Sequence, residues 1–114
     1  MLSTNLDHVT STEDYNALIK SKSKVAICCG RMGPMCIPVY GAFDALKSKY
    51  PEVGFYDMEF DSRTAAETIL RLPQVKGFNG LPFTIYYRDG EVVAATSSIQ
   101  TKAQIKEILD SKLS

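Results

Sequence analysis

Apolar residues along the chain gather in short runs, and the period of each run indicates whether it forms a strand or a helix. The segments 24–29 (KVAICC) and 53–60 (VGFYDMEF) are apolar on both faces, which is typical of central strands that are covered on both sides. The segments 81–88 and 91–98 instead alternate around Asp89–Gly90, and an Asp-Gly pair in that setting is a strong signal for a β-hairpin. The pattern therefore predicts four strands, with room for a fifth near the N-terminus.

Signals for helices fill the gaps between these strands. Residues 11–14 (STED) mark a helix start, with Ser or Thr as the cap and acids in the first turn. We expect a second helix from Pro34 to about Tyr50, because proline suits a first turn whose N–H groups stay unpaired. A short helix over 63–72 should end before a proline, and an amphipathic helix over 101–113 should close the chain.

The order of the elements predicts the fold class. Strands that are connected through a helix run parallel, whereas the two strands of a hairpin run antiparallel. The order (β)αβαβαββα therefore predicts an α/β protein with a mixed sheet and helices on both of its faces.

Composition and charge limit the number of domains and the classes of partner that we expect for this chain. The 114 residues, 45% hydrophobic and 23% charged, predict a single globular domain over residues 1–114. The 13 basic and 13 acidic residues balance and form no basic stripe, so nucleic-acid binding is not expected. No apolar stretch approaches the ~20 residues of a membrane span, and the N-terminus lacks the features of a signal peptide. We expect a cytoplasmic protein with no membrane partner.

The three cysteines all lie within residues 28–36. A disulfide scaffold would spread its cysteines over distant segments, so this clustering points to chemistry at one place. For Cys28, at the end of the predicted strand, a small buried apolar residue is the simpler interpretation.

Three segments together resemble the thioredoxin family, and the resemblance covers nearly the whole chain. They are VAICC leading into RMGPM, the segment 77–98 (GFNGLPFTIYYRDGEVVAATSS) and the closing TKAQIKEILDSKL. In that family the first segment ends in Trp-Cys-Gly-Pro-Cys, and the second holds a cis-proline before a hairpin. The resemblance implies a thioredoxin fold with a sheet of four or five strands, four helices and a cis Leu81–Pro82 bond. It also implies a monomer without cofactors and a link to thiol-redox homeostasis.

The residues that carry the family's reaction are altered here. The reaction needs a thiolate at a helix N-terminus and a second thiol about one turn later. Met32 occupies the attacking position, and a thioether has no proton to lose. By the same resemblance, Arg31 replaces the flanking Trp, Ala26 replaces the buried acid, and Asp57 replaces the Lys that partners this acid.

The position of the family's second cysteine has two registers. Counted from the Gly-Pro pair it falls on Met35, and counted back from the helix end it falls on Cys36. Both flank the expected inward stripe of the helix about equally, so the pattern alone does not choose between them. In the Cys36 register the resemblance equates Cys36 with the family's shielded second cysteine, so we expect a buried thiol. A buried thiol is inert, because desolvation outweighs the helix dipole.

A binding module is the first functional interpretation, with a client protein or peptide as its partner. The resemblance implies a shallow peptide groove made by three loops, with an exposed apolar patch of Met32, Leu81 and Ile99. The residues of this groove would be Arg31, Met32, Gly33, Pro34, Leu81, Pro82 and Ser98, within the loops 31–34, 80–82 and 97–99.

Two alternatives remain open from the sequence. A thiol-disulfide oxidoreductase would use the displaced thiols Cys36 and Cys29, so whether the chain is an enzyme stays open. A Cu(I) site would use the soft sulfurs of Met32, Met35, Cys36 and Cys29; no family precedent supports it, and we expect no metal. His8, far along the chain from these sulfurs, is expected to be a surface residue of a strand.

Asp57 lies within an apolar strand that should be central, so we expect a buried carboxyl. Its pKa should be raised unless a hydroxyl or an ordered water satisfies it. Either it bonds backbone or a tyrosine hydroxyl and is purely structural, or it replaces the family's missing acid from the opposite strand.

Overall fold

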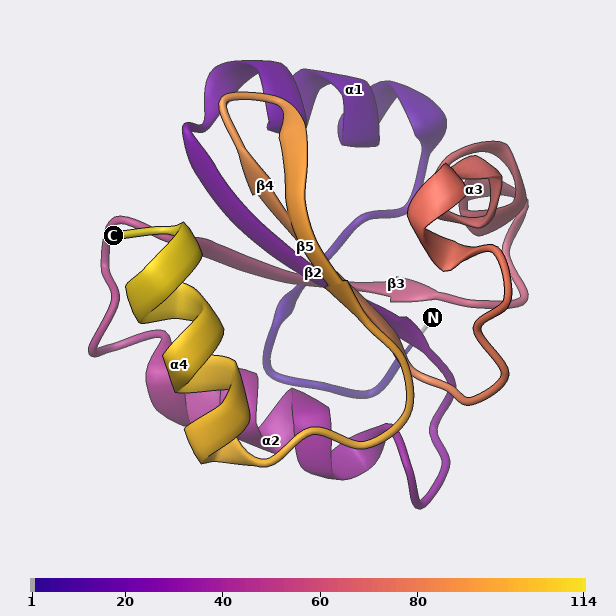
Figure 1. The fold of residues 1–114 in the computed structure, drawn as a ribbon. Helices are drawn as coiled ribbons and strands as arrows, with labels where there is room; N and C mark the ends of the chain where they lie inside the picture. Colours follow the sequence, from indigo (N-terminus) through magenta and orange to yellow (C-terminus); the bar gives the residue numbers. More distant parts are fainter. Residues whose placement is uncertain (1) are drawn as a thin grey trace.

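The computed structural model describes residues 2–114, which form a five-stranded sheet flanked by four α-helices (Figure 1). The strand order is β1-β3-β2-β4-β5; β1, β3 and β2 run parallel, and β4 and β5 run antiparallel to their neighbours. The strands are β1 (Asp7–His8), β2 (Lys24–Gly30), β3 (Gly54–Glu59), β4 (Phe83–Arg88) and β5 (Glu91–Thr96). The helices are α1 (Thr12–Ser21), α2 (Ile37–Leu46), α3 (Arg63–Glu67) and α4 (Lys102–Lys112).

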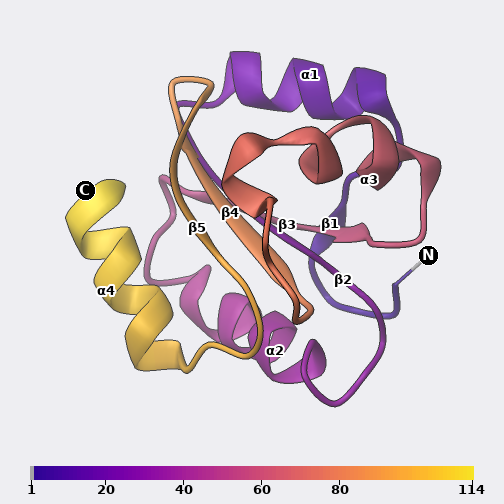
Figure 2. The same cartoon turned by 45° about the vertical axis from the view of Figure 1, so that its right-hand side comes forward.

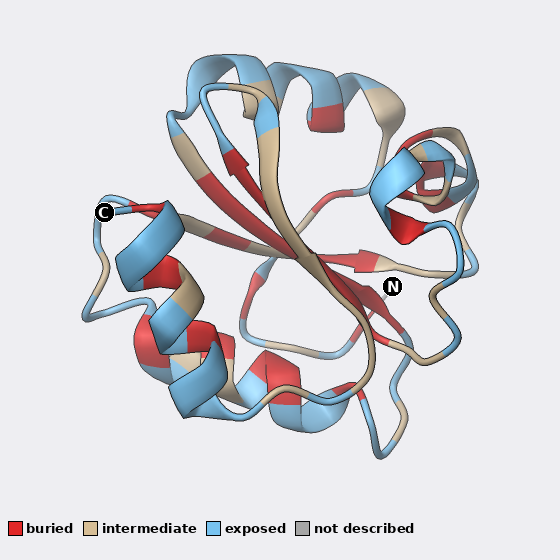
Figure 3. Cartoon of the chain, viewed as in Figure 1, coloured by how far each residue is buried: buried red, intermediate tan, exposed pale blue. Residues whose placement is uncertain are grey.

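The sheet lies between two helical layers, as the order of elements predicted. Helices α2 and α4 cover one face and α1 and α3 cover the other (Figures 1 and 2). Each face has its own cluster of buried side chains, and residues of β2 alternate between the two clusters. Figure 3 shows β2 buried along most of its length, whereas the outward faces of the helices are exposed. We call the two sides the α2/α4 face and the α1/α3 face.

The caps of α1 and α4 follow the sequence signals. The Ser11 hydroxyl accepts a hydrogen bond from the Asp14 N–H at 3.0 Å at the start of α1. Thr101 and Gln104 form a reciprocal capping box at the start of α4, in which each side chain accepts from the other's backbone N–H.

Helix α2 is shorter than the expected 34–50. It begins at Ile37, because Pro34 lies in a turn that closes when the Gly33 carbonyl accepts from the N–H groups of Cys36 and Ile37 at 3.1 and 3.0 Å. Pro38 takes a position in the first turn, where its missing N–H costs nothing. The chain beyond Leu46 continues as a turn to Tyr50.

The expected helix over 63–72 is also broken up. Its α-helical part, α3, ends at Glu67, and two 3₁₀ turns follow at Ile69–Arg71 and Pro73–Val75. Thr68 marks the break, because its hydroxyl donates to the Thr64 carbonyl at 2.7 Å and its backbone leaves the helical region. Within residues 2–114 no helix has the length and apolar character that crossing a membrane requires.

Candidate functional site

Three loops meet at one end of the sheet, where strands β2 and β5 end and strand β4 begins. Cys29 of β2 pairs with Phe83 of β4, and Thr84 of β4 pairs with Thr96 of β5, so the end of β2, the start of β4 and the end of β5 lie together. The loops at this end are therefore 31–36, 80–82 and 97–100, which contain the segments 31–34, 80–82 and 97–99 that the sequence assigned to the peptide groove.

Backbone contacts hold two of these loops in place. The Ser98 N–H donates to the Gly80 carbonyl at 2.9 Å, and Ser98 adopts a φ of 66°, in the left-handed region. A side chain at Gly80 would collide with the Ser98 hydroxyl oxygen and lie 3.2 Å from the Ser98 Cβ, so glycine allows this close approach without displacing Ser98. Ser98, predicted as a site residue from the sequence, thus positions the loop that presents Ile99.

The expected exposed patch differs in one member. The Leu81–Pro82 bond is cis, Pro82 is buried and Leu81 is only partly exposed. Leu81 packs against the hydrophobic clusters of both faces. The expectation that Leu81 adds an exposed apolar side chain is therefore wrong.

The exposed apolar side chains near these loops are not the ones that the sequence suggested. Gly33 and Pro34 form the turn of the loop after β2, and the side chains on either side point outward. Among the described residues, the large hydrophobic side chains that are clearly exposed are Met32 (45%), Met35 (44%), Ile37 (48%) and Ile99 (44%). We call these four residues the thioether patch.

A hollow of about 200 Å³ opens beside Met32. It lies between the N-terminal segment and α2, so it extends the patch in a direction that the sequence did not indicate. Its lining residues are Ser3, Thr4, Asn5, Met32, Ile37, Tyr40, Gly41 and Asp44.

Arg31 is not part of this apolar surface. Its guanidinium makes two hydrogen bonds to the Asp61 carboxylate, at 2.7 and 2.8 Å, and lies 5.1 Å from the centre of the Phe60 ring. The Arg31 guanidinium lowers the pKa of Asp61. Arg31 is exposed and its charge is paired, and its place beside a bound peptide stays a prediction.

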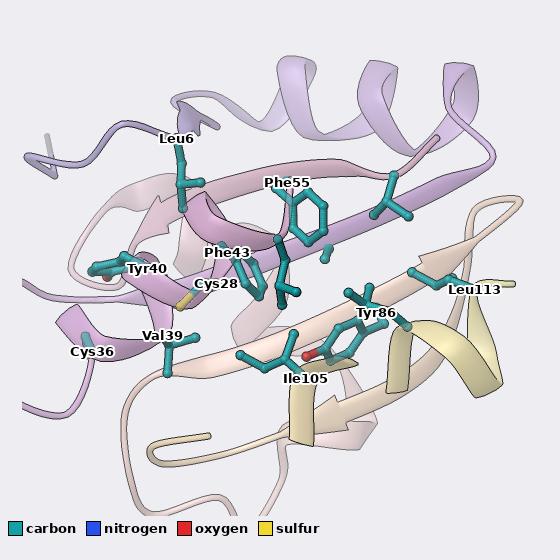
Figure 4. Close-up of a cluster of buried hydrophobic side chains, with 14 of the residues drawn as sticks. Leu6, Cys28, Cys36, Val39, Tyr40, Phe43, Phe55, Tyr86, Ile105 and Leu113 are labelled. Atoms are coloured by element: carbon teal, nitrogen blue, oxygen red, sulfur yellow. The ribbon is translucent and has the colours of Figure 1, made fainter. Parts of the chain in front are cut away.

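Cys36 lies directly under the loop and is 2% exposed. Its Sγ accepts a hydrogen bond from the Arg31 N–H at 3.4 Å, and the Tyr40 hydroxyl donates to the Arg31 carbonyl at 3.1 Å. A methyl group at Gly30 would lie 2.7 Å from this sulfur. Figure 4 shows Cys36 and Tyr40 at one end of the buried cluster, near Cys28. The predicted burial of Cys36 is confirmed.

Cys28 and Cys29 point to opposite faces of the sheet. Cys28 packs with Cys36 on the α2/α4 face, whereas Cys29 belongs to the cluster on the α1/α3 face. All three cysteines are free thiols. Burial raises the pKa of Cys28 well above its usual value and that of Cys29 to about 12. The proposed Cys29–Cys36 pair is contradicted, because the sheet lies between the two side chains.

The same placement removes the Cu(I) hypothesis, since its four sulfurs are not brought together. Cys29 and Cys36 lie on different faces, while Met32 and Met35 point outward. Over residues 2–114 there is also no cluster of three or more His, Cys, Asp or Glu side chains able to hold a metal ion.

A polar row crosses the α2/α4 face beneath this loop. Cross-strand pairing aligns one residue from each strand: His8, Asp57, Cys28, Thr84 and Thr96. Partners in register share a face, so all five side chains point toward α2 and α4. The hydroxyls of Thr84 and Thr96 are buried without a hydrogen-bond partner, although Thr84 lies close enough to Cys28 to oppose the rise in the pKa of its thiol.

Asp57 is buried as predicted, at 1% exposure, but its partners were not foreseen. Thr4 donates to one carboxylate oxygen at 2.5 Å, and the other lies 2.6 Å from Nδ1 of His8. Burial raises the pKa of Asp57, and these two partners oppose the shift. The expected tyrosine or backbone partner is therefore wrong, and His8 is more than a surface strand residue.

Sequence reasoning missed His8 and Thr4 because the strand that aligns His8 with Asp57 has only two residues. Such a strand leaves no readable period. Burial is the main cause of the raised pKa of Cys28 and of Tyr40, and the Asp57 carboxylate on the same face adds to both shifts. Its role as a replacement acid stays a prediction.

No protein-family model and no curated protein sequence matches this chain. Solved structures do match it. Thioredoxin from Plasmodium falciparum has a TM-score of 0.76 at 15% identity, with 94% of this chain and 99% of that chain covered. Mitochondrial thioredoxin 3 from Saccharomyces cerevisiae gives 0.73 at 20% identity, covering 92% and 94%. Fasciola hepatica thioredoxin gives 0.75 at 18% identity, covering 92% and 97%. The chain has the thioredoxin fold.

Proposed function

We propose that this thioredoxin-fold chain is an atypical member of the thioredoxin family that binds client proteins without dithiol chemistry. One observation carries the proposal: the family's reactive loop here presents apolar thioethers, while every thiol is at most 2% exposed. Exposed clusters of apolar side chains mark interaction sites, and methionine adapts to varied partners. The link to thiol-redox homeostasis rests on the fold and on the residues that resemble the family.

An extended, largely apolar polypeptide fits this surface best. The loop carries one guanidinium, and Asp61 already neutralises it, so charge does little to select the ligand. The hollow beside Met32 is lined by both polar and apolar residues and provides a place for one side chain of the client. We further propose that the chain acts as a monomer in the cytoplasm, without a nucleic-acid, membrane or cofactor partner.

The test uses insulin B chain whose thiols are blocked with iodoacetamide, so that binding cannot involve disulfide exchange. Fluorescence anisotropy of a labelled B chain should show saturable binding to the native protein. The double variant Met32→Glu/Met35→Glu should weaken binding at least about tenfold, because half-burying two methionines contributes about 1 kcal/mol each and ~1.4 kcal/mol is tenfold.

Asn16→Glu/Ala17→Glu is the matched control, because it adds the same two negative charges at exposed positions of α1 on the other face. It should bind the blocked B chain like the parent. Equal binding by the parent and the Met32→Glu/Met35→Glu variant would refute the proposed surface. The alternative function is tested by insulin reduction. If the native protein reduces insulin at a rate comparable to that of an ordinary thioredoxin, and Cys36→Ser abolishes this activity, the chain is a thiol-disulfide oxidoreductase and the proposed binding function is wrong.

A further inference from the structure

The Cys and Met residues within 2–114 form two groups, one buried and one exposed. Three cysteines and Met58 are at most 2% exposed, whereas Met32 and Met35 are 45% and 44% exposed. The exposed pair flanks the Gly33–Pro34 turn. Within residues 2–114, the sulfur that meets solvent is therefore thioether sulfur, at the place where the family presents a thiol.

Two of the three thiols, those of Cys28 and Cys29, are protected in a second way. The thiolate is the form that reacts with peroxides, and burial raises the pKa of Cys28 and of Cys29, the latter to about 12. An oxidant that reaches this protein consequently meets the two methionines of the loop first. Met58 differs from them, because it is buried and its Sδ lies 3.7 Å from the Thr68 hydroxyl.

We propose that Met32 and Met35 are sites of reversible oxidation to methionine sulfoxide, which switches the thioether patch off for apolar ligands. The inference rests on the proposed function for the meaning of the switch, but the modification itself rests only on exposure and shielding. The oxidant is hydrogen peroxide, and the reductant is a thiol-dependent methionine sulfoxide reductase.

The chemistry balances at each methionine. A lone pair of the thioether sulfur attacks one peroxide oxygen, an S–O bond forms, the O–O bond breaks and water leaves; the sulfur loses two electrons and the peroxide gains them. In reverse, two thiols of the reductase supply two electrons, form a disulfide, and release the oxygen as water.

The consequence for the surface follows from polarity. A sulfoxide turns a flexible apolar side chain into a polar one, so two of the four side chains of the thioether patch would become polar. The sulfoxide oxygen would require hydration that an apolar client side chain cannot replace. Oxidation should therefore weaken binding without unfolding the chain, because neither sulfur is in the buried core.

The first experiment maps oxidation on the native protein. After treatment with dilute hydrogen peroxide, peptide mass spectrometry should show Met32 and Met35 oxidising at least about tenfold faster than Met58, with the cysteines still unmodified. A sulfoxide reductase with dithiothreitol should restore the mass. Equal rates at Met58, or cysteine oxidation before methionine oxidation, would overturn the inference.

The second experiment measures the effect on the surface. Retention on a hydrophobic-interaction column, and binding of the blocked B chain, should both fall on peroxide treatment and recover with the reductase. The variant Met32→Leu/Met35→Leu keeps the other two methionines and is compared only with itself before and after peroxide. The retention of this variant should not change on peroxide treatment. If its retention falls as much as that of the parent, oxidation acts at residues other than Met32 and Met35, and the proposed switch is wrong.

The two proposals can fail separately. If the untreated protein does not bind the blocked B chain, the proposed function fails, and column retention still decides the switch. If the protein binds the blocked B chain, but oxidation of Met32 and Met35 changes neither its binding nor its column retention, the proposed switch is wrong and the proposed function stands.

Discussion

Gly30→Ala is the sharpest perturbation of the site, because it adds one methyl group where three segments converge. Gly30 is the last residue of β2 and is not among the residues with positive φ, so its backbone accepts alanine. The cost is steric. The new methyl would lie 2.7 Å from Cys36 Sγ, 2.9 Å from the Tyr40 hydroxyl and 3.0 Å from Cβ of Pro82.

The magnitude follows from these distances. Non-bonded heavy atoms prefer about 3.5–4.0 Å, so each neighbour must retreat by at least ~0.5 Å. The neighbours come from the start of α2 and from the loop before β4, and all three are buried. Over-packing of this kind costs about 1–3 kcal/mol. We expect ~2 kcal/mol, which lowers the urea midpoint by about 1 M for a slope of about 2 kcal/mol/M.

Two variants provide the controls for urea unfolding of Gly30→Ala. Gly41→Ala places a methyl where nothing lies within 4 Å, at an exposed position of α2, and should stabilise the protein by about 0.5–1 kcal/mol. Cys36→Ala removes the nearest obstacle, so the double variant Gly30→Ala/Cys36→Ala should lose less stability than the two single losses added together.

An unchanged midpoint for Gly30→Ala would refute this reasoning. Strict additivity in the double variant would also refute it, because it would mean that the added methyl never meets the Cys36 sulfur. Either result would remove the packing argument by which Gly30, Cys36 and Pro82 hold the loop in place.

Three further predictions concern buried polar groups. Burial raises the pKa of Asp57 above its unfolded value, so the carboxylate weakens the fold above that pKa; Asp57→Asn should raise the urea midpoint at about pH 7 and lose this gain by about pH 3. Tyr15→Phe breaks the 2.8 Å hydrogen bond to the Tyr87 hydroxyl and should cost about 1–3 kcal/mol in unfolding free energy, whereas Tyr86→Phe removes an unpartnered hydroxyl and should cost almost nothing. The three cysteines should react with iodoacetamide much more slowly in the native protein than free cysteine does, and urea should restore their reactivity.

The periodic parts of the sequence determined most of the fold. The apolar run KVAICC predicted β2 within one residue, and the Asp-Gly pair predicted the β4–β5 hairpin. Helix starts with side-chain caps were also readable, as Ser11 illustrates. Helix boundaries without a side-chain cap were harder to predict. Helix α2 begins at Ile37 and not at the expected Pro34, because the Gly33 carbonyl closes a separate turn before Ile37. Local hydrogen bonds made by single side chains, such as that of Thr68, leave no period in the sequence.

The sequence by itself, through its resemblance to the thioredoxin family, predicted that Met32 takes the place of the attacking thiol. It also predicted that Asp57 is buried, from its place within an apolar strand, and the resemblance predicted that Cys36 is buried, from the register that equates it with the family's shielded second cysteine. The burial of Asp57 was readable because the spacing of neighbours along a strand is fixed.

Only the tertiary structure decided which side chains meet. Cys28 and Cys29 are adjacent in sequence, yet only Cys28 shares the face of Cys36, because successive residues of a strand point to opposite sides of the sheet. The pairing of Arg31 with Asp61 and the bond between His8 and Asp57 join segments 30 and 49 residues apart. Such contacts are set by strand order and register, which arise when the whole sheet assembles and which no local period encodes.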